Sequence, residues 1–215
     1  MAQIDISGLT KIYAVGGQQI PAINNVSLQI NKGEFVSIVG HSGSGKTTLL
    51  SIIGGIMKPT SGSVLFEGQD ICMLGDDQLS AYRNEKIGFM FQFASLLPML
   101  TSIENVLLPG LFRQKPAADP EKRALEYLNL VGIGEKADAY PSQLSGGQQR
   151  RVAIARALLY DPQVILADEP TGDLDEETEA DIMELFRKLN IERKMTFVFI
   201  THNLDLARMA SRRLR

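Results

Sequence analysis

The stretch EFVSIVGHSGSGKT, Glu34 to Thr47, joins an apolar run to a glycine-rich loop that leads into the helical pattern KTTLLSII. Its second half, GHSGSGKT (Gly40 to Thr47), has the spacing G-x-x-x-x-G-K-[ST] between a predicted strand and a predicted helix. Glycines let backbone N–H groups turn toward phosphate oxygens, and the helix N-terminus adds partial positive charge. We therefore expect a phosphate-binding loop here rather than an ordinary glycine-rich turn.

Four side chains are expected to complete a nucleotide site around this loop. Lys46 would reach the β- and γ-phosphates, and the hydroxyl of Thr47 would ligate Mg²⁺. In VILADEP, Asp168 and Glu169 follow an apolar strand, and open α/β sheets place their sites at the carboxyl ends of strands. Asp168 would hold Mg²⁺ and Glu169 would orient or deprotonate the attacking water, whereas the bland alternative is a helix-capping acidic pair.

Two further polar residues follow apolar runs. His202 comes directly after TFVFIT and is expected to contact the γ-phosphate, although a single histidine is more often a surface or core residue. Gln92 ends GFMFQ at the junction with a helical segment and would report on the metal and the water. The alternative for Gln92 is a polar loop residue without a function.

The order of patterns predicts an α/β fold, with a β-rich layer beside a βα core. The runs Gln163–Glu169 and Thr196–His202 are almost unbroken apolar stretches, typical of strands buried on both faces of a parallel sheet. Shorter strands are expected at 4–6, 20–30, 34–40 and 64–66, with the pair Gly16-Gly17 forming a turn. From about Phe93 to Leu159 the chain is expected to be helical.

Two helices carry clear start signals. Asp119 and Pro120 supply an N-cap and a first helical residue, and the following helix is expected to bury one face until Gly132. That face consists of Ala124, Leu125, Leu128 and Val131. Asp175 is expected to cap a second helix, whose buried face consists of Ile182, Leu185, Phe186 and Leu189.

Composition narrows the classes of function. The chain has 215 residues, 44% hydrophobic and 22% charged, which favours one soluble domain with a subsidiary lobe. A net charge of −3 argues against nucleic acid as the main partner, although a local basic stripe is compatible with that total. No apolar run approaches the roughly 18 residues of a membrane span, so a role at a membrane requires a partner. The lone Cys72 is expected to be an inert thiol in or near the core.

The stretch QLSGGQQRRVAIARALL, Gln143 to Leu159, places two glycines at a predicted helix start. Ser145 and Gln148 have the spacing of a capping box, which is the simpler interpretation. A helix needing only a cap would do better with stronger helix formers than Gly146 and Gly147, whereas glycine leaves N–H groups accessible to an anion. This pattern indicates a second phosphate-binding helix end, serving a nucleotide held by another subunit.

Taken together, GHSGSGKT, Gln92, LSGGQQ, VILADEP, TGDLD and ITH resemble, in order and spacing, the ATP-binding cassette (ABC) ATPases over almost the whole chain. The resemblance implies a P-loop NTPase of the RecA-like type. Residues 1–92 and 160–215 would form its core with an antiparallel β subdomain, and residues 93–159 a helical subdomain. It also implies a head-to-tail dimer in which two ATP molecules lie between the P-loop of one copy and Ser145–Gly147 of the other.

The resemblance also assigns roles to individual residues. Those expected to bind ATP are Tyr13, which would stack on adenine, Gly40, His41, Ser42, Gly43, Ser44, Gly45, Lys46, Thr47 and Thr48, with Ser145, Gly146, Gly147 and Gln148 of the second copy. Those expected to take part in catalysis are Lys46, Gln92, Glu169 and His202, and those expected to hold Mg²⁺ are Thr47, Gln92 and Asp168. Asp173 to Asp175 would communicate across the dimer, and Gln92 would couple the site to a transmembrane subunit. For Tyr13, packing remains the alternative role.

The segment Gly88 to Phe112 is similar to the subgroup containing the LolD, MacB and FtsE ATPases, of lipoprotein release, macrolide export and cell division. It is expected to form the core of a lobe, a groove for a helix of a membrane protein, or both with different faces. His41 and Asn203 depart from the usual Pro or small residue and the usual Asp, respectively. Related sequences usually continue past SRRLR with a strand, so either the sheet edge or the dimer contacts are expected to be incomplete.

These expectations combine into an Mg-dependent ATPase subunit on the cytoplasmic face of the inner (plasma) membrane. It would drive a transmembrane permease by ATP-dependent dimer closure. A cassette ATPase acting on nucleic acid or ribosomes is the rival, but such proteins usually carry coiled-coil insertions or two fused cassettes. A nucleotide sensor with little turnover is the third alternative, and it is disfavoured because every expected catalytic position is filled.

Overall fold

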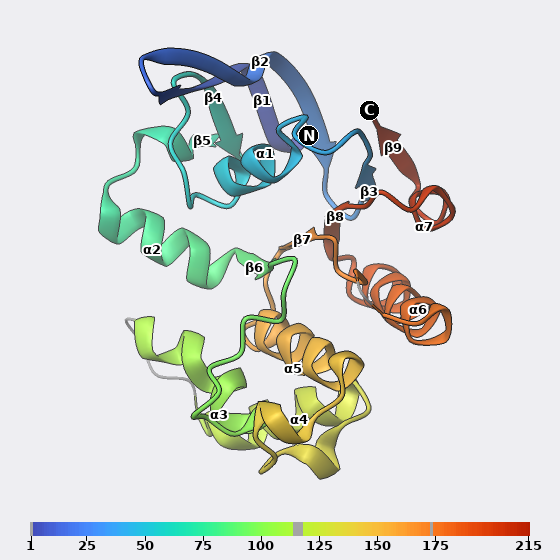
Figure 1. Cartoon of the computed structure of the whole chain (residues 1–215). Coiled ribbons are helices and arrows are strands. Elements are labelled where there is room, and N and C mark those ends of the chain that lie inside the picture. The colour runs from blue at the N-terminus through green and yellow to red at the C-terminus, as the bar shows by residue number, and fades with distance from the viewer. Residues whose placement is uncertain (1, 114–117, 173) are drawn as a thin grey trace.

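The computed structural model describes residues 2–113, 118–172 and 174–215, which fold around two β-sheets and a helical lobe (Figure 1). One sheet is antiparallel, in the order β2-β1-β4-β5, and the other is parallel, in the order β6-β7-β8-β3-β9. The strands are β1 (Ala2–Val15), β2 (Gln18–Asn31), β3 (Phe35–Ile38), β4 (Ser61–Phe66), β5 (Gln69–Asp70), β6 (Ile87–Met90), β7 (Val164–Asp168), β8 (Thr196–Ile200) and β9 (Arg212–Leu214). The predicted α/β class is confirmed.

Seven α-helices and several 3-10 turns occur in the described residues. The α-helices are α1 (Lys46–Ile53), α2 (Asp76–Glu85), α3 (Ser102–Leu107), α4 (Pro120–Leu130), α5 (Gly146–Leu158), α6 (Glu176–Arg193) and α7 (Leu204–Arg208). The 3-10 turns are η1 (Ile71–Met73), η2 (Leu108–Phe112), η3 (Gly134–Lys136) and η4 (Pro141–Gln143). Figure 1 shows α3, α4 and α5 grouped on the side of the parallel sheet away from the antiparallel one.

The parallel sheet is buried on both faces, as its apolar runs predict. Every residue of β3, β7 and β8 is buried. Because successive side chains point to opposite faces, alternate residues join two different cores. Val198 and Ile200 pack toward the antiparallel sheet and α1. Phe197 and Phe199 pack toward the helices of the lobe and α6.

The register of these strands brings the functional loops to one edge. Ile38 pairs with Ile200, and Asp168 pairs with the same Ile200. The strands therefore end level with one another, so the residues that follow them share the carboxyl edge of the sheet.

The predicted start of α4 holds, but one residue of its predicted buried face does not, and the segment expected to be helical from about Phe93 has its first helix only at Ser102. Asp119 accepts a hydrogen bond from the Lys122 N–H at 3.2 Å, as expected of an N-cap. Ala124, Leu128 and Val131 are buried, but Leu125 is 40% exposed. The prediction that Leu125 faces the core is therefore wrong, since it lies next to Ala124 and points to the outer edge of the apolar stripe.

Three elements depart from or add to the predicted pattern. Helix α2 and strand β6 precede the helical lobe, and the end of the chain forms β9 within SRRLR. Strand β9 pairs in parallel with β3 through Val36↔Arg212 to Ile38↔Leu214. Residues 212–214 therefore add one strand to the parallel sheet beyond β3.

Two expectations from the sequence concern the position of Cys72 and the absence of a membrane span. Cys72 is half-buried against the core beneath the antiparallel sheet, and burial raises its pKa, which disfavours the thiolate. The predicted position of Cys72 near the core is therefore confirmed. Within the described ranges, no helix has both the length and the apolar character needed to cross a membrane.

Asp161 joins the helical lobe to the core after α5. Its carboxylate contacts Arg123 and Tyr127 of α4, and Arg193 of α6 lies 3.1 Å from it. Asp161→Ala is expected to lower the free energy of unfolding, because it removes these contacts between α4, α6 and the loop after α5. The expected loss is only about 1 kcal/mol, because the partners are partly exposed and solvent screens the charges.

Asp161→Asn is the matched comparison, since Asn accepts the left-handed conformation of this residue (φ 47°) and still reaches Tyr127. Urea unfolding of both variants measures the difference. Equal stability of the wild type and Asp161→Ala would contradict a stabilising role for this contact.

Candidate functional site

An open hollow of about 510 Å³ lies at the carboxyl edge of the parallel sheet. Loops that follow β3, β6, β7 and β8 surround it, with a contribution from the antiparallel sheet. The residues that line it are Tyr13, Ala22, Gly40, Ser42, Gly43, Ser44, Gly45, Lys46, Thr47, Thr48, Gln92, Asp168, Glu169, Ile200 and His202. The structure thus brings together predicted site residues that are up to 189 positions apart, from Tyr13 to His202.

The glycine-rich loop wraps around the Lys46 ammonium. Lys46 Nζ donates to the carbonyl oxygens of Gly40 at 2.9 Å and His41 at 2.8 Å. These contacts hold the ammonium at the mouth of the loop, where α1 begins. Gly45, the N-cap of α1, has φ 84°, and a Cβ there would collide with the carbonyl oxygen of Ala22. The loop therefore requires glycine at this position for its backbone conformation and for its packing on β2.

Glu169 and His202 meet across the ends of β7 and β8. His202 Nδ1 lies 3.1 Å from Glu169 Oε2, and the His202 backbone N–H donates to the same oxygen at 3.3 Å. The Glu169 N–H donates to Ile200 O at 3.1 Å, and its φ of 47° is unusual for a residue with a side chain. The Glu169 side chain is 16% exposed and that of His202 78%. The carboxylate is therefore oriented by the loop that carries the histidine.

The donor set suits Mg²⁺. Thr47, Gln92 and Asp168 bring hydroxyl, amide and carboxylate oxygens to the hollow. No cluster of three or more His, Cys, Asp and Glu side chains able to hold a metal is found in the described part of the chain. Mg²⁺ prefers oxygen ligands and is usually held by one or two protein groups with phosphate and water oxygens, so this sparse set fits it.

Of two residues expected to bind ATP, Tyr13 lines the hollow, whereas the side chain of His41 lies in a neighbouring groove. The Tyr13 ring borders the hollow, and its hydroxyl lies 3.3 Å from Thr48 Oγ1 and 3.1 Å from Met57 Sδ. The side chain of His41 is exposed and lines a neighbouring groove, while its carbonyl oxygen accepts from Lys46. His41 therefore contributes to the loop through its backbone, which any residue type could do.

The segment LSGGQQ, Leu144 to Gln149, which we call the signature segment, leads into α5, the signature helix, and lies outside this hollow. Ser145 Oγ accepts from the Gln148 N–H at 3.2 Å, and Gln148 Oε1 accepts from the Ser145 N–H at 2.9 Å, so the predicted capping box forms. A Cβ on Gly147 would lie 2.8 Å from Thr178 Cγ2, whereas one on Gly146 would approach nothing closer than Leu174 at 3.8 Å. Packing against α6 thus accounts for Gly147 but not for the exposed Gly146.

Asp173, predicted to communicate across a dimer, lies outside the described residues. Asp175 accepts from the Thr178 N–H at 2.9 Å and caps α6, as predicted. Hydrogen bonds to backbone and side chain lower the pKa of this carboxyl.

Arg150 is a functional candidate that the sequence analysis missed. It is 5% exposed, and its guanidinium donates to the carbonyl oxygens of Phe91 (3.0 Å), Gln92 (2.7 Å) and Gly172 (3.3 Å). One side chain from the signature helix therefore holds two loops of the site. The signal was present, because Arg150 lies four and eight residues before the buried Ile154 and Leu158, on the inner face of the helix.

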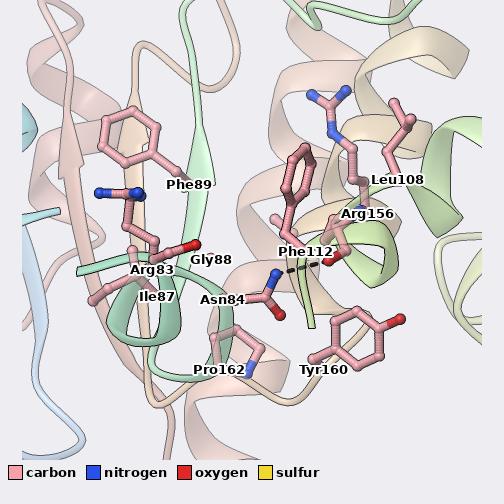
Figure 2. A pocket seen from close by; sticks show the side chains of 13 residues that line it. Arg83, Asn84, Ile87, Gly88, Phe89, Leu108, Phe112, Arg156, Tyr160 and Pro162 are labelled. Carbon is pink, nitrogen blue, oxygen red and sulfur yellow. Dashed lines mark hydrogen bonds between the residues drawn. The ribbon is translucent and has the colours of Figure 1, made fainter. Parts of the chain in front are cut away.

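A second concave surface, which we call the lobe groove, lies between α2 and β6 on one side and η2 and α5 on the other (Figure 2). It encloses about 430 Å³. Asn84 Nδ2 donates to Pro109 O at 2.7 Å and spans the two sides, and Phe112, which is 69% exposed, projects into the groove in Figure 2. The segment Gly88 to Phe112 thus contributes both to the lobe core, through Val106, and to this groove.

Comparison with known proteins places the geometry in context. A family described as "ABC transporter" matches residues 23–172. The chain is 44% identical to the lipoprotein-releasing system ATP-binding protein LolD of Myxococcus xanthus, over 100% of this chain and 96% of that protein. It is also 44% identical to the macrolide export ATP-binding/permease protein MacB of Syntrophobacter fumaroxidans, covering 30% of that protein. A dimeric, post-hydrolysis structure of the ATP-binding cassette MJ0796 with ADP and Pi superposes with a TM-score of 0.91, 46% identity and coverage of 99% and 94%.

Proposed function

This chain belongs to the ABC transporter family as an ATPase subunit, and from that premise we propose that it drives a permease of the lipoprotein-releasing or macrolide-export type. It would do so while bound to the cytoplasmic face of the membrane. The observation that carries the proposal is the convergence of the P-loop, Asp168, Glu169 and His202 on one hollow. Recovery of a permease with this chain from detergent-solubilised membranes tests it.

The residues that line the hollow would have different roles in the transfer of the γ-phosphoryl group to water. Lys46, already oriented by Gly40 and His41, neutralises charge on the phosphate oxygens as it develops. Glu169 orients or accepts a proton from the attacking water, and its contact with His202 sets the direction of its carboxylate. His202, largely exposed, remains able to contact the γ-phosphate. Tyr13 offers its ring to the adenine.

Mg²⁺ would be held by Thr47, Gln92 and Asp168, and when bound it neutralises phosphate charge as a Lewis acid. Arg150 fixes the backbone of Gln92 and so limits where the Gln92 side chain can reach. A movement of that loop would therefore change whether Gln92 reaches the Mg²⁺. In this way Gln92 would couple the site to a partner that moves the loop.

The separation of Ser145–Gln148 from the hollow supports a head-to-tail dimer. The first N–H groups of α5 have no partners within the helix, and Ser145 and Gly146 at that end are exposed. We propose that they contact the nucleotide of a second copy. Residues 93–159 would act as the helical subdomain that carries them, with residues 1–92 and 160–215 forming the core.

The lobe groove is the proposed seat of the permease. Exposed apolar side chains near it and along the adjoining loop include Phe91, Phe93, Leu97, Met99, Leu111 and Phe112. A helix from a membrane protein would bury these side chains. A shift of that helix would move Gln92, because one loop joins the groove to the hollow.

Phe112→Asp is expected to weaken permease binding by at least about tenfold, because it places a charge where an apolar anchor would be buried. ATP binding should be unchanged, since Phe112 lies outside the hollow. Ile191→Asp, at a 65% exposed apolar residue of α6 outside the groove, is the matched control. Co-purification from membranes measures the loss, and equal recovery with both variants would contradict docking in the groove.

A further inference from the structure

We propose that Glu179, on α6, is a positioning residue that holds the loop of Glu169 against the loop of His202. The inference rests on the catalytic roles proposed above for Glu169 and His202. Glu179 would be the third acidic residue of the site, after Asp168 and Glu169. Unlike those two, it does not line the hollow.

The carboxylate of Glu179 bridges the two loops. Its Oε1 accepts from the Thr171 hydroxyl at 2.7 Å, and its Oε2 accepts from Asn203 Nδ2 at 3.1 Å. Thr171, 3% exposed, is two residues after Glu169, and Asn203 follows His202 directly. Each oxygen of one carboxylate therefore holds one catalytic loop.

The bridge closes a ring of contacts. On the side facing the hollow, Glu169 and His202 meet at 3.1 Å, and on the side facing α6, Thr171 and Asn203 meet Glu179. Helix α6 is a suitable support, because it has 18 residues and is packed into the core through Ile182 and Phe186. Loops gain a defined placement when they are hydrogen-bonded to such a rigid element.

Asn203 is suited to this contact in a way that a carboxylate is not. Its Oδ1 accepts from the backbone N–H groups of Asp205 (2.9 Å) and Leu206 (3.4 Å) and caps α7, while its Nδ2 donates to Glu179. An Asp at this position would still cap α7 but would set a second carboxylate against Glu179. The identity of residue 203 is therefore matched to the acid at 179.

Four variants test the bridge. Glu179→Ala is expected to lower kcat for ATP hydrolysis about tenfold, since small misplacements of catalytic groups are costly, with the KM for ATP nearly unchanged. Glu179→Gln should retain most activity, because an amide can accept from Asn203 and donate to Thr171. Asn203→Asp should lower kcat through repulsion, and adding Glu179→Gln to it should restore activity, because the amide can donate to the new carboxylate. Glu176→Ala, at an exposed acid of the same helix, is the control.

The restoration distinguishes positioning from general stability. NMR of the His202 ring should change in Glu179→Ala and Asn203→Asp and return toward the wild type in the double variant. Wild-type kcat in Glu179→Ala would overturn the inference, as would a double variant no better than Asn203→Asp. Glu169→Gln, measured alongside, separates the two levels: full turnover in that variant removes the proposed role of Glu169, whereas its inactivity beside a fully active Glu179→Ala removes only the bridge.

Discussion

Glu169→Gln is expected to bind ATP with nearly wild-type affinity while its rate of hydrolysis falls by about 10²- to 10⁴-fold, the usual contribution of a general base. The amide keeps the size and shape of the carboxylate but cannot accept the proton of the attacking water. Its oxygen can still accept from the His202 N–H, as Glu169 Oε2 does at 3.3 Å, so the loop should remain in place. Binding of a fluorescent ATP analogue and phosphate release under single turnover measure the two quantities separately.

Glu126→Gln, at an exposed position of α4, removes one negative charge elsewhere and should hydrolyse ATP at the wild-type rate. If Glu169→Gln kept wild-type turnover, Glu169 would not be the general base. Asp168 would then be the remaining acidic residue among those named in the lining of the hollow. Loss of ATP binding together with turnover would also contradict the prediction, since it would assign Glu169 to binding rather than to the chemical step.

Sequence patterns predicted the parallel strands well, because burial on both faces leaves a simple signature. Strands β7 and β8 are unbroken apolar runs, and their positions match the predicted segments within a residue or two at each end. Once those strands are placed, the residues after them must share one edge of the sheet. The grouping of Asp168, Glu169 and His202 with the P-loop followed from this reasoning, and the structure shows it.

Elements with weak burial could not be predicted in the same way. Helix α2 buries only Leu79 and Tyr82 among its ten residues, so its apolar period is faint. Strand β9 is mostly exposed and rich in arginine, and it is a strand because the edge of β3 offers backbone hydrogen bonds. Its pairing partner lies far away in sequence, and no local pattern encodes it.

The motifs likewise did not predict the contacts that position the site residues. The spacing of Arg150 from Ile154 and Leu158 indicates the inner face of its helix but not which groups it holds, and the neighbours of Glu179 suggest an ordinary helix surface. Their roles arise because α5 and α6 pack beside the loops after β6, β7 and β8, which brings Gln92, Thr171 and Asn203 within hydrogen-bonding distance. Motifs identify the groups that meet the substrate, whereas tertiary packing determines which residues hold those groups in place.

Gly146→Asp is expected to abolish ATP-driven dimer formation and to reduce turnover by about 10²-fold or more, because it sets a carboxylate where the signature helix should meet a phosphate. The fold should tolerate the change, since Gly146 is exposed and a Cβ there meets only Leu174 at 3.8 Å. Gly146→Ala, which adds the Cβ without the charge, is the control. Light scattering of the Glu169→Gln background with Mg-ATP measures dimer formation.

Mixing Gly146→Asp with Lys46→Ala then tests the head-to-tail arrangement. Each variant alone should be inactive, because one lacks a competent signature and the other a competent P-loop. In a head-to-tail heterodimer, the intact P-loop of the first faces the intact signature of the second, so one of the two sites is whole and part of the activity returns. If both elements instead served a nucleotide within the same chain, every chain in the mixture would carry one defect and no activity would return. Restoration therefore requires that Ser145–Gly147 act on a nucleotide bound by the partner.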